Sequence, residues 1–339
     1  ADNDCDGCVD DDLCCAGELD CPEPGDPRVP ETTPFSDYAL HGADFYTGDA
    51  SSWEWEVHGP PCDAMRERNG SPARSYTLTG ADTADPTIRF TLSGDYTVVM
   101  RVTTPTGEVL ECTFIIHVRG PGLRVELCWD RTGGMFHTDL DLHLHRPGST
   151  TEWFGSVLPD ETWSISNDDC YYCNCKASIF CDSADGPPDW GYADTDLENC
   201  ENGPGGPAWR AHGACRNPRL DIDNMSPMDG AKPENINIDE PREGETFRVM
   251  VHYYSGTMAT HPIVNVYCGG YLVGTYGDVP DELGGFDGSG EQGWGAGEMW
   301  RVVDVTTRVA GGVVTCDLDP LRAPSDPTSY WVTESDLTY

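Results

Sequence analysis

Residues 139–144 read Asp-Leu-Asp-Leu-His-Leu, a strict alternation of polar and apolar side chains. Successive side chains of a β-strand point to opposite faces. The alternation therefore predicts a strand that buries three leucines and places Asp139, Asp141 and His143 together on its other face. Residues 123–129, Leu-Arg-Val-Glu-Leu-Cys-Trp, also have a strand pattern. Neither stretch has the three- and four-residue spacing of an amphipathic helix, so this region is expected to form β-sheet.

Further strand patterns outline one large domain around these two stretches. Residues 247–254 and 264–268 are rich in β-branched and aromatic side chains, and a last pattern closes near residues 312–316. We therefore predict a jelly-roll-like β-sandwich over residues 123–319. A loop-like insertion, residues 160–218, interrupts it and contains six cysteines. An insertion of this length needs support from disulfides or a metal.

A smaller domain precedes the large one, over residues 35–119. Its strand patterns, separated by turn residues, lie at residues 53–57, 75–78, 87–92, 96–102 and 112–118. Strands at this spacing, without helical periodicity between them, predict a sandwich. The sequence Gly-Pro-Gly at residues 120–122 marks the domain boundary. The predicted fold class is therefore all-β, with two tandem β-sandwich domains and no helix of any length.

The two ends of the chain differ from the domains. Residues 1–22 form an acidic, cysteine-rich stretch, and the proline-rich residues 23–34 predict a semi-rigid extended linker. Residues 320–339 form a tail in which strand-forming side chains alternate from Ser329 onwards. Exposed sheet edges accept strands from other chains, so this tail is a possible donor strand for polymerisation.

The 16 cysteines predict an oxidising compartment, because a reducing cytosol does not keep so many thiols paired. We expect Cys62 to pair with Cys112, and Cys268 with Cys316. Five cysteines then remain before residue 22 and seven between residues 128 and 215. Both remainders are odd, which predicts a bond from the N-terminal stretch to the second domain or to a neighbouring subunit. Zinc coordination is the less favoured alternative, because the gaps between the cysteines are irregular.

The apolar stretches are far shorter than the roughly 20 residues that cross a bilayer, so no membrane insertion is expected. Ala1 begins an acidic stretch and not the basic start of a signal peptide, which suggests that any such peptide has been removed.

The net charge of −39 disfavours binding to nucleic acid and to anionic membranes. Divalent calcium would neutralise much of this charge; a salt-adapted surface without specific sites is the alternative.

Three segments carry resemblances to known bacterial extracellular modules. Residues 2–11, Asp-Asn-Asp-Cys-Asp-Gly-Cys-Val-Asp-Asp, resemble a short acidic metal-binding repeat of secreted proteins and lipoproteins of predatory Gram-negative bacteria. Trp53, Trp55 and the strand pattern of residues 90–102 resemble a PKD-type immunoglobulin-like sandwich, over residues 30–119.

The large domain resembles the YfaP-like family of secreted β-sandwich domains, over residues 121–316. The resemblance is carried by seven blocks in order, residues 123–130, 139–144, 169–172, 188–191, 220–224, 233–236 and 248–254. Members of that family have no established catalytic activity, so the resemblance implies a non-catalytic extracellular role.

The N-terminal stretch also predicts a calcium loop. Acidic residues at alternate positions, followed by Gly7 where the chain must turn, form the first half of such a loop. Leu13 replaces the usual glutamate at position twelve, so a later aspartate has to substitute for it. The expected ligands are Asp2, Asp4, Asp6, Asp10 and Asp12. A solvated acidic tail is the alternative.

A second calcium site is predicted in the large domain. Asp139 and Asp141 share one strand face, as do Asp221 and Asp223, and pairs of buried carboxylates are costly without a cation. If the two strands are neighbours, as the resemblance implies, further ligands can join them. The expected additional ligands are Asp169, Asp189, Asn224 and Asn235, with Glu234 as an alternative to the asparagines. An outward-facing acidic stripe paired with arginines is the competing interpretation, and a transition metal on His143 and His145 is less favoured.

Partner-binding residues are expected among the exposed aromatics. Trp190, Trp209 and Trp294 lie in glycine-rich loops, where they could fill a partner's pocket, stack on a sugar or pack locally. Tyr330 and Trp331 belong to the possible donor strand.

No catalytic motif is found, since Ser289 lacks the first glycine of a nucleophile elbow and H-E-x-x-H is absent. Carboxylates are too abundant for an acid pair of a glycoside hydrolase to be informative.

The predicted function is therefore that of a non-catalytic, secreted, calcium-binding structural or adhesive protein. Its expected location is extracellular or at a bacterial cell surface, as a subunit of a filament or other assembly. Expected partners are other copies of the chain, cell-surface components or glycans. The alternatives are a carbohydrate- or surface-binding module and, less favoured, a hydrolase whose site has no known motif.

Overall fold

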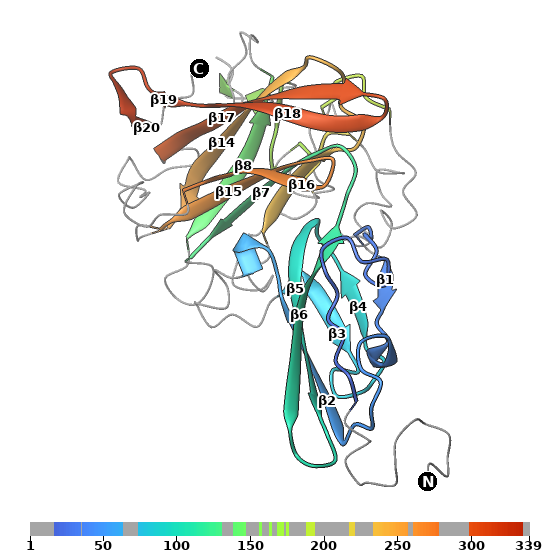
Figure 1. The fold of residues 1–339 in the computed structure, drawn as a ribbon. Helices are drawn as coiled ribbons and strands as arrows, with labels where there is room; N and C mark the ends of the chain where they lie inside the picture. Colours follow the sequence, from blue (N-terminus) through green and yellow to red (C-terminus); the bar gives the residue numbers. More distant parts are fainter. Residues whose placement is uncertain are drawn as a thin grey trace, which may run out of the picture. The chain divides into compact units, whose positions relative to one another are not determined.

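The computed structural model describes residues 17–34, 36–63, 74–130, 138–146, 156–157, 163–164, 168–172, 174–175, 188–193, 217–220, 233–256, 260–277 and 298–334 (Figure 1). The chain divides into two compact units. The first ends at Arg119 and excludes residues 61–74, which belong with the second. Almost all regular structure is β-sheet, which confirms the all-β prediction. No helix in the described ranges has the length and apolar character needed to cross a bilayer.

The first unit is a sandwich of two three-stranded antiparallel sheets. One sheet has the order β1 (Asp37–Ala39), β4 (Thr87–Phe90) and β3 (Tyr76–Thr79). The other has the order β2 (Ser52–His58), β5 (Gly94–Thr103) and β6 (Val109–Val118). Every second residue of β5 from Tyr96 to Val102 is buried, as the alternation predicts, and Tyr96, Val98 and Met100 belong to the shared core. The hydroxyl of Tyr96 donates to the carbonyl of Leu92 at 2.9 Å, the arrangement of a tyrosine corner.

The segment expected to be an extended linker packs against this sandwich instead. Cys21 is disulfide-bonded to Cys112 on β6, and Thr32 forms a parallel bridge with Val118. The prediction of a spacer at residues 23–34 was therefore wrong. Proline-rich sequence predicts an extended backbone, but an extended segment can lie along a sheet as readily as it can span solvent.

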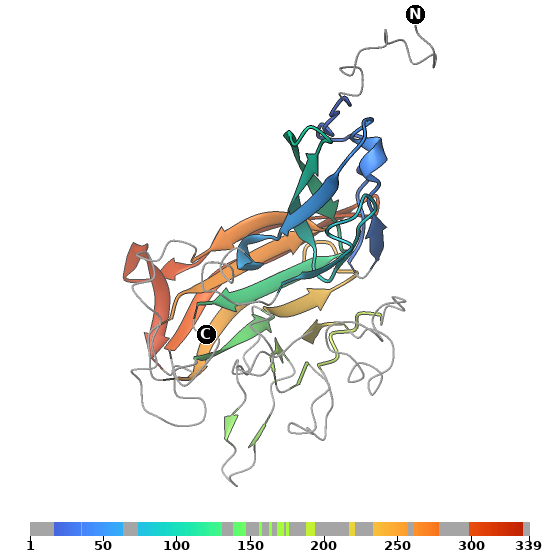
Figure 2. The same cartoon turned by 90° about the horizontal axis from the view of Figure 1, so that it is seen from below.

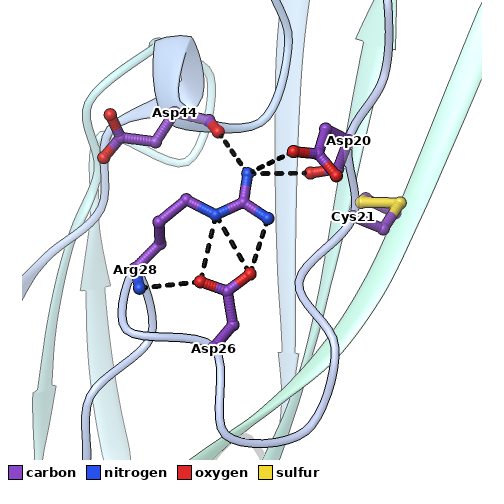
Figure 3. Close-up of a disulfide and its surroundings, with 6 residues drawn as sticks. Asp20, Cys21, Asp26, Arg28 and Asp44 are labelled. Carbon is purple, nitrogen blue, oxygen red and sulfur yellow. Dashed lines mark hydrogen bonds and ion pairs between the residues drawn. A yellow bond between two sulfur atoms is a disulfide. The ribbon is translucent and has the colours of Figure 1, made fainter.

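Arg28 holds this segment in place through a planar network (Figure 3). Its Nε donates to Asp26 Oδ1 at 3.1 Å and Nη2 to Asp26 Oδ2 at 2.6 Å, a bidentate pair. Nη1 donates to Asp20 Oδ2 at 2.9 Å and to the carbonyl of Asp44 at 2.8 Å. The guanidinium also lies over the Phe45 ring, 5.6 Å from its centroid. One side chain therefore connects three separate parts of the N-terminal region.

The second unit contains a seven-stranded and a five-stranded sheet, both visible in two views (Figures 1 and 2). The seven-stranded sheet has the order β11 (Asp169–Cys170), β8 (Asp139–His145), β14 (Thr246–Ser255), β17 (Glu298–Ala310), β20 (Asp326–Glu334) and β19 (Arg322–Ala323), with β18 (Val313–Pro320) also paired to β17. The five-stranded sheet has the order β12 (Arg219–Leu220), β13 (Glu234–Ile238), β7 (Leu123–Trp129), β15 (Pro262–Cys268) and β16 (Tyr271–Tyr276). A separate two-stranded sheet joins β9 (Ser156–Val157) to β10 (Trp163–Ser164).

The apolar face of each sheet contributes to one core. Leu140, Leu142 and Leu144 of β8 are fully buried there, together with Val125 and Leu127 of β7. Each buried leucine contributes about 1.5–3 kcal/mol relative to exposure, so the alternation in β8 fixes which face turns inward.

Some of the described residues of the cysteine-rich insertion belong to this core. Cys170 and Cys175 form a disulfide across a separation of five residues, and both belong to the buried cluster with Trp190. Residues 169–170 extend the sheet as β11, beside β8. Strand β11, Cys175 and Trp190 are therefore structural parts of the second sandwich.

The possible donor strand is already paired within its own chain. Strand β20 pairs antiparallel with the first part of β17, with Trp331 opposite Arg301 and Val332 opposite Trp300. Tyr330 also contacts the edge of the Trp300 ring, with centroids 5.5 Å apart. The tail prediction was therefore wrong for residues 326–334, because the vacant sheet edge that this alternating sequence completes belongs to the same domain.

One of the two expected cysteine pairings, Cys62 with Cys112, differs in the structure. Cys62 is bonded to Cys128 and Cys112 to Cys21, whereas the pairing of Cys268 with Cys316 is confirmed. With these bonds, four cysteines remain before residue 22 and six between residues 170 and 215, including the Cys170–Cys175 pair. Both remainders are now even. The parity argument for a bond from the N-terminal stretch to the second domain or to a neighbouring subunit therefore no longer holds.

The Cys268–Cys316 bond should be a major source of stability in the second sandwich. It closes a separation of 48 residues, so replacing both cysteines with alanine should lower the free energy of unfolding by about 4 kcal/mol on a chain-entropy estimate. The same change at Cys170 and Cys175, five residues apart, should cost only about 2 kcal/mol on that estimate. Urea unfolding of both double variants would measure the difference; equal losses would contradict the entropic origin.

Candidate metal centre

The polar residues of β8 share the face opposite its leucines, yet they are not exposed. Asp139, Asp141, His143 and His145 are all buried, with 7% exposure at most. Strand β14 lies beside them, and its register places His252 opposite Asp141. This row of polar residues on the outer face of the seven-stranded sheet is called the β8 polar row below. Its members need internal partners or a bound ion, because buried polar groups are costly when left unsatisfied.

Three side chains of this face converge on one point. Asp141, His143 and His252 each offer one ligand atom, and these atoms lie within 4.8 Å of one another. Asp141 Oδ2 is 3.7 Å from His252 Nδ1, and the two imidazole rings are 6.1 Å apart at 77°. Two residues from one strand and one from its antiparallel neighbour can meet in this way because cross-strand pairs on one face lie close together.

Asp169 supports the cluster from the adjacent strand. Its Oδ2 lies 2.7 Å from Nδ1 of His143, while its fully buried Oδ1 has no hydrogen-bond partner among the described residues. Asn174 closes the turn behind it, donating to the carbonyl of Asp169 at 2.7 Å and accepting from the backbone N–H of Tyr171 at 3.1 Å. The Cys170–Cys175 disulfide spans the same turn. This turn therefore fixes the position of Asp169.

Aromatic rings cover the cluster. Tyr171 stacks on His143, with centroids 5.1 Å apart and planes 11° apart. Tyr172 makes edge contacts with Tyr171 at 5.3 Å and with Tyr254 at 5.4 Å. The rings place the cluster in an environment of low polarity, which strengthens every charge interaction inside it.

Burial controls the protonation of the cluster. It lowers the pKa of both His143 and His252 to about 3, so both imidazoles are neutral at neutral pH and each has a nitrogen lone pair. Burial, followed by the negative charge of Asp168, raises the pKa of Asp169 well above its usual value. The pKa of Tyr254 is raised by burial first and then by the negative charge of Asp141. A cation in the cluster would favour the carboxylate forms.

The structure brings together only some of the predicted calcium ligands. Asp139, Asp141 and Asp169 lie on or beside the β8 polar row, as expected. Asp189 is exposed and accepts the backbone N–H of Gly191. The other predicted ligands of this site, Asp221, Asp223 and Asn224, lie outside the described residues, as do Asp2, Asp4, Asp6, Asp10 and Asp12 of the N-terminal loop.

Asn235 is not part of the cluster. Its Oδ1 accepts from Arg124 Nε at 3.0 Å on the outer face of the five-stranded sheet, across the sandwich from Asp141. Its neighbour Glu234 points the other way, and its Oε2 accepts the backbone N–H of Leu142 at 2.7 Å. A shift of one position along a strand changes the face, which explains why Asn235 was a wrong prediction.

His252 is the cluster residue that sequence reasoning missed. The same strand alternation that buries Val251 and Tyr253 in the core places His252 on the outer face. This orientation of His252 could have been predicted from the alternation in residues 247–254. Its position opposite Asp141 depends on strand pairing across more than 100 residues, which no local pattern indicates.

The predicted partner-binding aromatics are mostly packed within the fold. Trp190 is 4% exposed and stacks on Phe247 with centroids 5.8 Å apart, so its assignment as a partner-binding residue was wrong. Tyr330 packs against the core beside Trp300. Trp331 is half-buried, with the guanidinium of Arg301 4.8 Å from its ring centroid. Trp209 and Trp294 lie outside the described residues.

Comparison of the chain with models of known families, with curated proteins and with solved structures finds no match. The resemblances to PKD-type and YfaP-like domains therefore stay predictions. What can be said of function depends on the residues of the chain itself.

Replacing Trp190 with alanine should destabilise the second sandwich by about 3–5 kcal/mol, because it removes a large side chain from the core. Val313→Ala is the control, since Val313 is 61% exposed in the same sandwich, and it should change stability by less than about 0.5 kcal/mol. Chemical unfolding of the two variants would measure both effects. A stable Trp190→Ala variant would return this residue to the set of candidate partner contacts.

Proposed function

We propose that this chain is an extracellular structural or adhesive protein that binds and assembles without catalysing a reaction, and that bound divalent cations stabilise it. The observation that carries this proposal is the burial of the β8 polar row. Asp141, His143 and His252 are 2% exposed or less, so the cluster has the chemistry of a metal site but little room for a substrate. Structural metal sites are closed, whereas catalytic ones keep a position open to substrate.

The disulfides support an extracellular location. Four cysteine pairs are bonded in the described part of the chain, and they fit an oxidising environment. The large negative charge agrees with this setting, because calcium is abundant outside cells and can neutralise carboxylates. The N-terminal aspartates of residues 2–12 offer only oxygen ligands, so calcium is the ion we propose for that loop.

An exposed sheet edge supports a role in assembly. Strand β16 is at the end of the five-stranded sheet, and Tyr271, Leu272 and Val273 are 51%, 41% and 41% exposed. An edge strand with adjacent apolar side chains can pair with a strand of another molecule. We propose this edge, in place of the C-terminal tail, as the contact between copies of the chain.

Removing divalent ions should weaken both the fold and the assembly. Native material in excess EDTA should unfold at a temperature several degrees lower than in its purification buffer, because the buried carboxylates would lose their counter-charge. Differential scanning calorimetry would measure the shift, and electron microscopy of the same samples would show whether assemblies persist. An unchanged melting temperature together with intact assemblies would contradict the metal-stabilised part of the proposal.

A charged residue on the β16 edge should block assembly without unfolding the domain. Leu272→Lys places a charge on the exposed edge, where charged residues commonly prevent strand addition. Val313→Lys is the control, since Val313 is 61% exposed but lies on β18. Sedimentation velocity should show smaller particles for Leu272→Lys only. If the two variants form particles of the same size, the β16 edge is not the contact between copies of the chain.

A further inference from the structure

We infer that Asp141, His143 and His252 form a binding site for a first-row transition metal ion, zinc being the ion that this donor set suits, and not for calcium. The inference rests on the proposed function in one respect, that a divalent cation stabilises the second sandwich. It goes further by naming the class of ion, its three side-chain ligands and the residue that orients one of them.

The donor atoms decide between the two classes of ion. Calcium takes six to eight oxygen ligands, and two of the three converging side chains here offer nitrogen. Zinc binds imidazole nitrogen and carboxylate oxygen at about 2.0–2.2 Å. Two imidazoles with one carboxylate also suit iron and other first-row ions. The donor set therefore defines a class of ions, the first-row transition metals, and zinc is the member proposed.

The backbone places the three ligands within reach of one ion. His143 follows Asp141 by two residues on the same face of β8, and His252 is directly opposite Asp141 on β14. Ligand atoms on a tetrahedral zinc ion are roughly 3.3 Å apart, a value that follows from the bond lengths. The ligand atoms, at most 4.8 Å apart, would have to approach one another by about 1.5 Å, a shift that side-chain rotation can supply.

Asp169 occupies the place of an outer-shell residue. Metal-bound histidines usually donate their other ring N–H to a carboxylate, which fixes the tautomer and the orientation of the ring. The contact of 2.7 Å between Asp169 Oδ2 and His143 Nδ1 has this form, and it leaves Nε2 of His143 as the metal-binding nitrogen. Asp169, predicted from sequence as a direct ligand, is therefore a positioning residue.

The ion would join two strands of the seven-stranded sheet beneath the tyrosine cover. Its positive charge would offset the cost of burying Asp141 and Asp169. Three side chains leave at least one coordination position to another donor, and the burial of the cluster closes that position to a substrate. The burial of the cluster assigns the ion a role in stability.

The test uses the full chain, stripped of metal with a chelator and then dialysed. Zn²⁺, Co²⁺ and Ca²⁺ are added separately, and calorimetry measures the melting temperature and the binding stoichiometry. Zn²⁺ and Co²⁺ should raise the melting temperature of the second sandwich with one equivalent bound per chain, whereas Ca²⁺ should leave that transition unchanged. One equivalent of Cu²⁺ should give an electron paramagnetic resonance spectrum with coupling to two imidazole nitrogens.

Variants identify the ligands. His252→Gln should weaken Zn²⁺ binding at least 100-fold, and Asp169→Asn should weaken it by about 10- to 100-fold. His145→Gln is the matched control, because His145 is equally buried on the same face of β8 but does not belong to the converging set. It should bind Zn²⁺ within threefold of the unmodified chain. If His252→Gln does not fold, the nitrogen coupling in the Cu²⁺ spectrum of the unmodified chain shows whether two histidines bind the ion.

The outcomes separate this inference from the proposed function. Stabilisation of the second sandwich by Ca²⁺ but not by Zn²⁺ would overturn the inference and leave the proposed function intact. If neither ion stabilises that sandwich, the inference is overturned, and so is the proposal that a divalent cation stabilises this domain. Zn²⁺ binding that survives His252→Gln, or a Cu²⁺ spectrum without nitrogen coupling, would show that the ion binds elsewhere and would also overturn the inference.

Discussion

The second sandwich depends on one constraint, that both faces of β8 are buried although only one is apolar. The leucines fill the core between the sheets, and the opposite face carries two aspartates and two histidines beneath the turn of residues 169–175. Burying such groups costs several kcal/mol each unless they are paired, hydrogen-bonded or bound to a cation. The position of β11, the tyrosine cover and the register with β14 all serve to satisfy this polar face.

The strand positions and the direction of their side chains could be predicted from the sequence. Alternation in residues 139–144 correctly indicated which side chains of β8 turn inward, because burial of one face fixes the side-chain parity. Alternation is a local property, however, and it does not predict which strand pairs with which. The pairing of β20 with β17 was missed for this reason, since an alternating tail has the same sequence whether its partner is its own sheet or another molecule.

The candidate site shows the same limit more sharply. Asp141 and Asp169 could be predicted because carboxylates are the usual calcium ligands, whereas calcium rarely binds the nitrogen of histidine. His252 became relevant only through a strand pairing across a long sequence separation, while Asn235 fell on the wrong face by a single residue. Trp190 was misjudged because a glycine-rich sequence suggests exposure, whereas this loop returns to the core and stacks its indole on Phe247.

The cysteine framework and the polar cluster are physically connected at one point. Cys170 and Cys175 close the turn that carries Asp169, so the disulfide limits the freedom of the carboxylate that contacts His143. Ordering that carboxylate beforehand reduces the entropy lost when an ion binds, as in other preorganised sites. Closure of this disulfide would therefore favour tight binding of the proposed ion. The physical reason is that the closed turn holds Asp169 against Nδ1 of His143, which would leave Nε2 of that imidazole for the proposed ion.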